Sequence, residues 1–176
     1  MKRTALMILL LVCAICGEAR AGRIIDGMVR AVYDGDTVLL TTREQSRLKV
    51  RLYGIDAPET QKPDKPGQPY GEVAKRTLQY KIMGRQVSAE IVETDQYQRA
   101  VAVIRYKGRD INREMVAEGM AWAYRQYLQG PYASEYIGSE NRARSSRLGL
   151  WRDNRPTPPW EFRRSAAGRG GYGRSR

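Results

Sequence analysis

The sequence predicts a mainly β domain of the α+β class, in which five short strands form a small barrel and three α-helices pack around it. Short runs of alternating or β-branched apolar residues, separated by turn-forming residues, account for much of residues 24–106. A two-residue period of this kind is typical of β-strands. Longer runs between and after these strands have apolar residues three or four positions apart, which is the pattern of amphipathic helices.

The five predicted strands follow one another along the first part of the chain. They are expected at residues 28–33, 37–42, 47–52, 86–93 and 100–106. Asp34-Gly35, between the first two strands, favours a tight hairpin turn. In the fourth strand Val87, Ala89 and Ile91 alternate with other residues, so we expect one face to be buried. Strands this short and this numerous are typical of a small barrel.

The three predicted helices are expected at residues 70–83, 110–118 and 132–148. In the first of them Ala74, Leu78 and Ile82 recur every four residues, which predicts a buried face. Gly84 then ends the helix. A Pro-rich loop at residues 61–69 precedes it and separates the first three strands from the helix.

One folded domain is expected between two segments of different composition. Residues 1–21 are predicted to be a signal peptide, with a basic start, an apolar run and an Ala19-Arg-Ala21 cleavage site. The apolar run is too short to span a bilayer, so we expect export to a periplasm or to the exterior without a stable membrane anchor. Residues 22–151 are predicted to form the domain, and residues 152–176, rich in Pro, Gly and Arg, a partly disordered tail.

The composition narrows the chemistry that this chain can perform. It has 31 Lys and Arg against 19 Asp and Glu, a formal net charge of +12, which favours nucleic acids or anionic surfaces as partners. It has no histidine, and both cysteines, Cys13 and Cys16, lie in the predicted signal peptide. These facts exclude catalytic histidines and the usual zinc sites from the domain. Carboxylates, Arg, Lys and Tyr remain, together with calcium or magnesium held by oxygen ligands.

Carboxylates gather at the ends of the first three predicted strands. Asp36 follows a turn and Asp56 follows a strand, and hairpin pairing would bring both to one end of the barrel. With the carbonyl of Ala57 and water they would form a calcium site, although each aspartate could instead be a turn or capping residue. Glu59 follows Pro58, whose fixed φ stiffens the loop and suits the carboxylate to the role of general base.

Cationic and aromatic side chains are the other candidate binding groups. Arg51 lies near the end of a strand, where it could form a surface ion pair or contact a phosphate. Tyr124, Tyr127 and Tyr132, with Arg125, could stack on bases in a cationic groove, or they could be ordinary packing residues.

Several motifs occur in an order that is found in a known family. They are Asp34-Gly-Asp-Thr-Val38, Arg51-Leu-Tyr-Gly-Ile-Asp-Ala-Pro-Glu59, the turn Asp95–Arg99, Gly119-Met-Ala-Trp-Ala-Tyr124, Gly149-Leu-Trp151 and Pro158-Pro-Trp-Glu-Phe162. In these motifs the chain resembles the staphylococcal nuclease-like thermonucleases over nearly all of residues 24–163. The resemblance implies an OB-type Greek-key barrel. It also implies an exported, calcium-dependent, sugar-nonspecific nuclease that cleaves DNA and RNA and leaves 3′-phosphates.

The resemblance further implies roles for individual residues. The implied metal ligands are Asp36, Asp56 and the carbonyl of Ala57, the catalytic residues Arg51, Glu59 and Arg99, and the nucleotide-binding residues Tyr97, Tyr127 and Tyr124. Glu59 would be the base or the group that orients water, and the two arginines would stabilise the transition state.

Two residues depart from the family pattern. Gln98 replaces a glycine in the turn before Arg99, and Gln96 replaces a residue that is often basic. If position 98 has a positive φ, glutamine costs roughly 1–2 kcal/mol there. We therefore expect weaker nucleotide binding, with the chemistry retained.

Two other function classes stay open on the sequence alone. The first is a catalytically weak or inactive nucleic-acid-binding module on the same fold. The second is a cationic protein that binds the cell envelope, which would bind anionic lipid rather than DNA. For the nuclease we expect a preference for single-stranded substrate, a monomer and no obligate protein partner.

Overall fold

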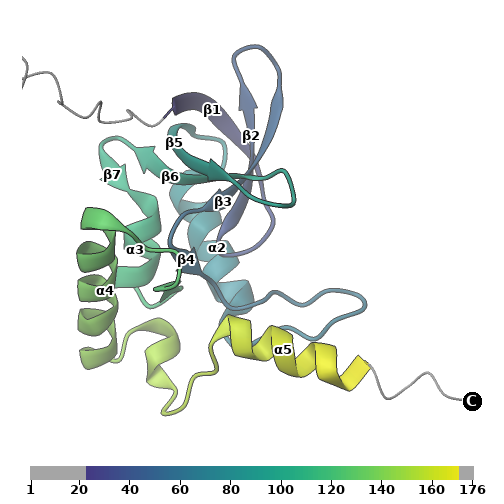
Figure 1. Cartoon of the computed structure of the whole chain (residues 1–176), viewed down its shortest axis with the longest axis vertical. Helices are drawn as coiled ribbons and strands as arrows, with labels where there is room; N and C mark the ends of the chain where they lie inside the picture. Colours follow the sequence, from purple (N-terminus) through teal and green to yellow (C-terminus); the bar gives the residue numbers. More distant parts are fainter. Residues whose placement is uncertain (1–22, 171–176) are drawn as a thin grey trace, which may run out of the picture.

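A computed structural model of the chain describes residues 23–170 (Figure 1). Its centre is a β-barrel of five strands: β1 (Arg23–Val32), β2 (Thr37–Thr42), β3 (Arg47–Leu52), β5 (Gln86–Thr94) and β6 (Ala100–Tyr106). The strands pair antiparallel in the order β3-β2-β1-β5-β6, and a parallel pairing of β3 with β6 closes the barrel. The predicted mainly β class and five-stranded barrel are confirmed. The predicted signal peptide lies outside the described residues.

Three two-residue strands complete the sheets. β7 (Arg109–Asp110) extends β6 as a short hairpin. β4 (Ile55–Asp56) pairs antiparallel with β8 (Trp122–Ala123), so that Asp56 lies opposite Trp122. This second pairing matters for the site, because it holds the segment after β3 against a distant part of the chain.

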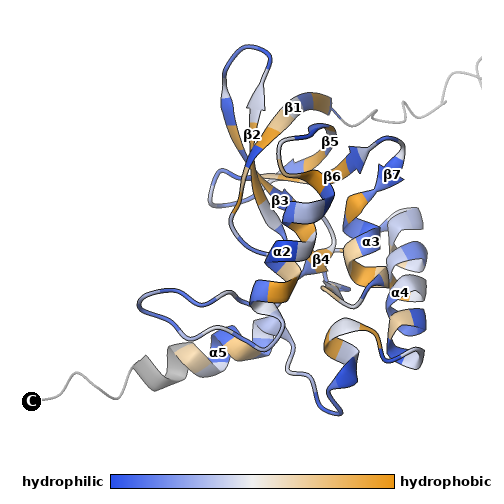
Figure 2. Cartoon of the chain, turned by 180° about the vertical axis from the view of Figure 1, so that it is seen from behind, coloured by the Kyte–Doolittle hydropathy of each residue, from blue (hydrophilic) through white to orange (hydrophobic). Residues whose placement is uncertain are grey.

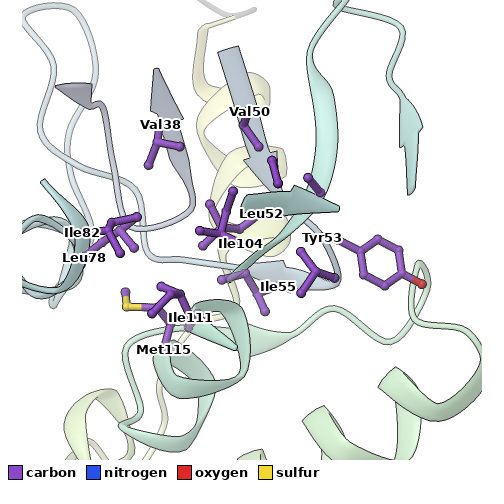
Figure 3. Close-up of a cluster of buried hydrophobic side chains, with 14 of the residues drawn as sticks. Val38, Val50, Leu52, Tyr53, Ile55, Leu78, Ile82, Ile104, Ile111 and Met115 are labelled. Atoms are coloured by element: carbon purple, nitrogen blue, oxygen red, sulfur yellow. The ribbon is translucent and has the colours of Figure 1, made fainter. Parts of the chain in front are cut away.

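The core lies inside the barrel and beneath two helices. Figure 3 shows Leu78 and Ile82 of α2 on one side and Ile111 and Met115 of α3 on another, around barrel residues such as Leu52. All of these side chains are buried. Since full burial of each such side chain contributes roughly 1.5–3 kcal/mol, this layer provides much of the stability of the fold.

The three predicted helices are present with small changes in their bounds. They are α2 (Gly71–Ile82), α3 (Ile111–Ala117) and α4 (Gly130–Ser145), followed by the 3₁₀ turn η2 (Gly149–Arg152). α3 lies against the barrel, and α4 lies beside α3 on its outer side (Figure 1). In Figure 2 α4, the outer helix of this pair, is mostly pale or blue, whereas α3 shows orange residues. This difference fits the position of α3 between the barrel and α4.

A fourth helix, α5 (Pro159–Gly170), is a correction to the sequence-based prediction, which placed these residues in a partly disordered tail. Proline is favoured in the first turn of a helix, and here Pro159 begins it. The helix docks through Trp160, whose ring lies 5.5 Å from that of Trp122 and is stacked at 5.2 Å on Tyr124. These tertiary contacts outweigh the polar composition of the segment.

A second cluster of buried residues supports this docking. Trp122 and Trp151 meet edge to face at 4.4 Å, and Trp160 packs against the same cluster. The three tryptophans therefore join α5 to β8 and η2. In the described part of the chain, no helix combines the length and apolar character needed to cross a membrane.

Candidate active site

A cavity of about 680 Å³ opens at one end of the barrel, where the β1–β2 turn, the β3–β4 segment, the β5–β6 turn and α5 come together. The predicted site residues that line it are Asp36, Arg51, Ala57, Glu59, Tyr97, Arg99, Tyr124 and Tyr127. Asp56 is fully buried and reaches the site through its contacts with arginines. The structure thus brings the predicted metal, catalytic and nucleotide-binding residues to one place.

Asp36 is the buried acid of the β1–β2 turn. Its Oδ1 accepts hydrogen bonds from the hydroxyl of Thr37 (2.9 Å) and from Nη1 of Arg51 (3.2 Å). Its Oδ2 accepts the backbone N–H of Ala57 at 3.0 Å. The turn is tight, since a Cβ at Gly35 would lie 2.6 Å from the Cβ of Ala57. Glycine therefore allows the β1–β2 turn to pack against the loop that carries Ala57.

Arg51 joins the two predicted metal-binding aspartates. Besides Asp36, its guanidinium contacts Asp56, with Nη2 3.0 Å from Oδ1. The Arg51 side chain is 19% exposed, so it remains accessible from the cavity while both carboxylates are buried. Of the two readings left open by the sequence, a surface ion pair does not describe this arrangement. Arg51 neutralises two buried acids at the floor of the cavity.

The charge of the β1–β2 turn is concentrated on one carboxylate. Burial, and then the neighbouring Asp36, raises the pKa of Asp34 to about 7. Burial also disfavours the ionised form of Asp36, but Arg51 and the N–H of Ala57 outweigh it and lower the pKa of Asp36. Near neutral pH Asp36, facing Arg51, is therefore ionised, whereas Asp34 is only partly ionised.

Glu59 is held by Gln68, a buried residue that the sequence analysis missed. The side-chain oxygen of Gln68 accepts the backbone N–H of Glu59 at 3.0 Å, and the backbone N–H of Gln68 donates to the carbonyl of Glu59 at 2.8 Å. The side-chain amide of Gln68 also donates to the carbonyl of Thr157 at 3.0 Å. Gln68 therefore ties the Glu59 loop to the segment that leads into α5.

The start of α2 also fixes this loop. A Cβ at Gly71 would lie 2.1 Å from the carbonyl oxygen of Glu59, so only glycine allows the helix to begin so close to the loop. The side chain of Glu59 remains half-buried at the cavity wall. A carboxylate on a loop fixed at its backbone is well placed to accept a proton from a bound water.

Arg163 of α5 is the second residue that the sequence analysis missed. Its guanidinium forms a two-point contact with Asp56, at 3.1 Å to Oδ1 and 2.8 Å to Oδ2. Its Nη1 also lies 2.8 Å from Oε1 of Glu59. The helix thereby places a third arginine beside the predicted metal ligand and the predicted base. The Pro158-Pro159-Trp160 start of a helix was the signal that could have indicated a docked segment here.

Arg99 lies at the rim of the cavity. Its Nε donates to Oδ2 of Asp95 at 2.7 Å, and its backbone N–H donates to Oδ1 of the same residue at 3.0 Å. The guanidinium also lies 5.4 Å from the ring centroid of Tyr97. This β5–β6 turn therefore presents a cation and a 69% exposed aromatic ring together, which suits a phosphate and its attached base.

The β5–β6 turn contains a strained residue, because Gln98 has φ 59°. This confirms the positive φ considered for that position.

Gln98→Gly is expected to stabilise the fold by roughly 0.5–1 kcal/mol, because relief of the left-handed strain exceeds the entropy cost of glycine. The melting temperature should rise by about 1–4 °C in a calorimetric scan. Gln96→Gly, in the same turn but without a positive φ, should instead lower it. A melting temperature that fails to rise in Gln98→Gly would show that the turn is not strained.

The tyrosines divide into two groups. Tyr124 and Tyr127 line the cavity with their rings 4.7 Å apart, and Tyr127 is 47% exposed. Tyr132 lies elsewhere, packed on Tyr53 at 5.7 Å and hydrogen-bonded to Glu90. The suggestion that Tyr132 stacks on bases beside the other two is therefore wrong, and its alternative, ordinary packing, is the correct one.

Comparisons with known proteins point in the same direction as this geometry. Residues 49–153 match the family model described as staphylococcal nuclease homologue. An uncharacterized endonuclease of Haemophilus influenzae is 36% identical over 162 residues, which cover 92% of this chain and 83% of the relative. A micrococcal nuclease of Shigella flexneri is 37% identical over 149 residues, covering 80% of this chain and 81% of the relative. Protein ParB of Escherichia coli is 35% identical, with 81% of each chain covered.

Proposed function

Since the chain belongs to the staphylococcal nuclease family, we propose that it is a calcium-dependent nuclease that hydrolyses phosphodiester bonds of DNA and RNA. The products would carry 3′-phosphates. The observation that supports this proposal best is the pair of buried aspartates, Asp36 and Asp56, joined by Arg51 beneath a cavity that Glu59 borders. Such a site has acceptors for a cation, donors for a phosphate and a base for water.

Different residues of the chain bind the phosphate, activate the water and hold the neighbouring nucleotides. Arg51 and Arg99 donate hydrogen bonds to the phosphate and neutralise the negative charge that grows on its oxygens as water attacks. Glu59 orients that water and accepts its proton. Tyr97, Tyr124 and Tyr127 hold the neighbouring nucleotides by contact with their rings. No histidine is needed for any of these steps.

The residues present suit calcium by their chemistry. Asp36, Asp56 and the carbonyl of Ala57 would hold the ion, and all three supply the oxygen ligands that calcium prefers. Among the described residues no three carboxylate, His or Cys side chains are arranged to hold a metal, so water would have to complete the coordination shell. When bound, the ion would add positive charge beside the phosphate and hold water near it.

Arg163 is expected to compete with calcium, because its guanidinium contacts both oxygens of Asp56. In nucleic-acid-free protein, Arg163→Gln should therefore raise the affinity for calcium by up to about 5-fold, measured by titration calorimetry. Arg164→Gln removes the same charge from the next residue and is the matched control. Equal effects of the two substitutions, or weaker calcium binding by Arg163→Gln, would contradict the competition.

The biological setting is also part of the proposal. The predicted signal peptide at residues 1–21 supports export to a periplasm or to the exterior. An open cavity with exposed aromatic side chains supports a preference for single strands, whose bases are free to stack. We propose that the protein acts as a monomer without an obligate protein partner.

The test is degradation of single-stranded DNA by the purified protein, with calcium and with a chelator. Cleavage that requires calcium and leaves 3′-phosphate ends is the expected result. The main alternative is a nucleic-acid-binding module on the same fold. Tight binding of DNA without cleavage in any divalent metal would support that alternative and overturn the nuclease.

A further inference from the structure

A second cavity, of about 970 Å³, lies beside the candidate active site, between β8, α4 and α5. Tyr124 and Arg163 line both cavities, so the two adjoin at these side chains. The other lining residues that matter here are Trp122, Arg125, Arg144, Trp160 and Arg164. We call this cavity the α5 groove.

The α5 groove is strongly cationic. Arg125, Arg144, Arg163 and Arg164 border it, whereas Glu140 is the one acid among its lining residues. Glu140 is fully buried, and its carboxylate is already paired with Arg125 (2.9 Å) and Arg144 (3.4 Å). The two arginine side chains nevertheless remain 57% and 43% exposed, so their unused donors face solvent. The groove therefore has donors for anions beyond those that its own acid requires.

Aromatic rings also line the groove, and two of them, Tyr124 and Trp160, are only half-buried. The ring of Trp160 is parallel to that of Tyr124, with an interplanar angle of 1°. The guanidinium of Arg144 lies 3.9 Å from the ring centroid of Trp151 and 4.8 Å from that of Trp122. Aromatic rings and stacked guanidinium groups are the surfaces on which unpaired bases stack, and the arginines between them suit the connecting phosphates.

We propose that the α5 groove is a second binding site for the substrate, which takes the nucleotides of a single strand that flank the phosphate in the catalytic cavity. This inference rests on the proposed nuclease function. Tyr124 and Arg163 mark the point where the strand passes from one cavity into the other. A duplex does not fit this role, because its bases are paired and are not free to stack on Trp160.

Arg164 is the best position for a test, since it is exposed and no ion pair joins it to another described residue. Binding of single strands from a dinucleotide to a dodecanucleotide is measured in chelator, with fluorescence titration for the longer strands. All three tryptophans of the chain lie in or against the groove, so their emission reports its occupancy. Wild-type affinity should rise steeply once a strand is long enough to span both cavities.

For the dodecanucleotide, Arg164→Glu is expected to weaken binding by about 5–10-fold and to lower the salt dependence of log K by about 0.7. The matched control is Arg43→Glu, on the exposed turn between β2 and β3. It carries the same charge change and should weaken binding at most about 2-fold. The dinucleotide is expected to occupy the catalytic cavity alone, and no tryptophan of the described chain lines that cavity. Its binding is therefore measured by titration calorimetry and should be alike in both variants.

Two results would overturn the α5 groove as a binding site. One is an affinity that does not increase with strand length, and the other is an equal loss in Arg164→Glu and Arg43→Glu. The nuclease function is judged separately, by cleavage of the dodecanucleotide with calcium. If the protein cleaves the dodecanucleotide but fails the binding test, the proposed nuclease function stands and the α5 groove is rejected as a binding site.

Discussion

Arg51→Ala is expected to lower the rate of phosphodiester hydrolysis by about 10²–10³-fold, the effect of losing one preorganised donor to the transition state. The same change should destabilise the fold by about 3–5 kcal/mol, because it leaves Asp36 without its arginine and Asp56 with Arg163 alone. Hydrolysis is measured on single-stranded DNA with saturating calcium, and stability by denaturant unfolding in chelator. Both effects arise because one guanidinium serves the site and the fold together.

Arg99→Ala separates these two effects. Arg99 pairs with Asp95 near the surface, and such a pair contributes only about 0–1 kcal/mol to stability. The rate should nevertheless fall by about 10²–10³-fold, as for Arg51→Ala. If Arg51→Ala kept a rate near that of the wild type, Arg51 would be a structural counter-charge without a role at the phosphate. The same result for Arg99→Ala would leave that arginine as a turn residue.

The barrel could be predicted because its signals are local. Alternation in β5 and the hairpin turn at Asp34-Gly35 depend on neighbouring residues. Four of the five strands were expected within one residue of their observed bounds, whereas β1 begins at Arg23 and not at the expected residue 28. The pairing of β3 with β6 that closes the barrel joins Val50 to Ala100, far apart in sequence. Such a contact leaves no periodic pattern in the sequence. The closure of the barrel could therefore be predicted only from the number of strands and from the resemblance to a known family.

The site could be predicted only in part, for a similar reason. Asp36, Arg51 and Glu59 lie at strand ends and in one stiff loop, where the sequence shows unusual polar residues beside apolar runs. Gln68 and Arg163 act through contacts across 9 and 104 residues, between segments that look like ordinary loop and tail. Their roles depend on how α5 docks, and composition alone indicated disorder there.

Glu59→Gln is expected to lower kcat on single-stranded DNA by about 10²–10⁴-fold, because a neutral amide cannot accept a proton from water. The substitution keeps the size of the side chain. The backbone of residue 59 would still be held by Gln68, and Arg163 would still be held by Asp56. The fold and the cavity should therefore persist, and the free energy of unfolding should change little.

Binding and chemistry are then measured apart. The affinity of Glu59→Gln for a single-stranded dodecanucleotide in chelator should stay within a few-fold of the wild type, since the arginines and tyrosines that contact it are unchanged. Glu44→Gln, the same substitution on the exposed β2–β3 turn, is the control and should keep the wild-type kcat. If kcat of Glu59→Gln also stayed near the wild type, the base would have to be sought elsewhere. Asp34 also lines the cavity, and its pKa, raised to about 7 by burial, would make a pH–rate profile the next measurement.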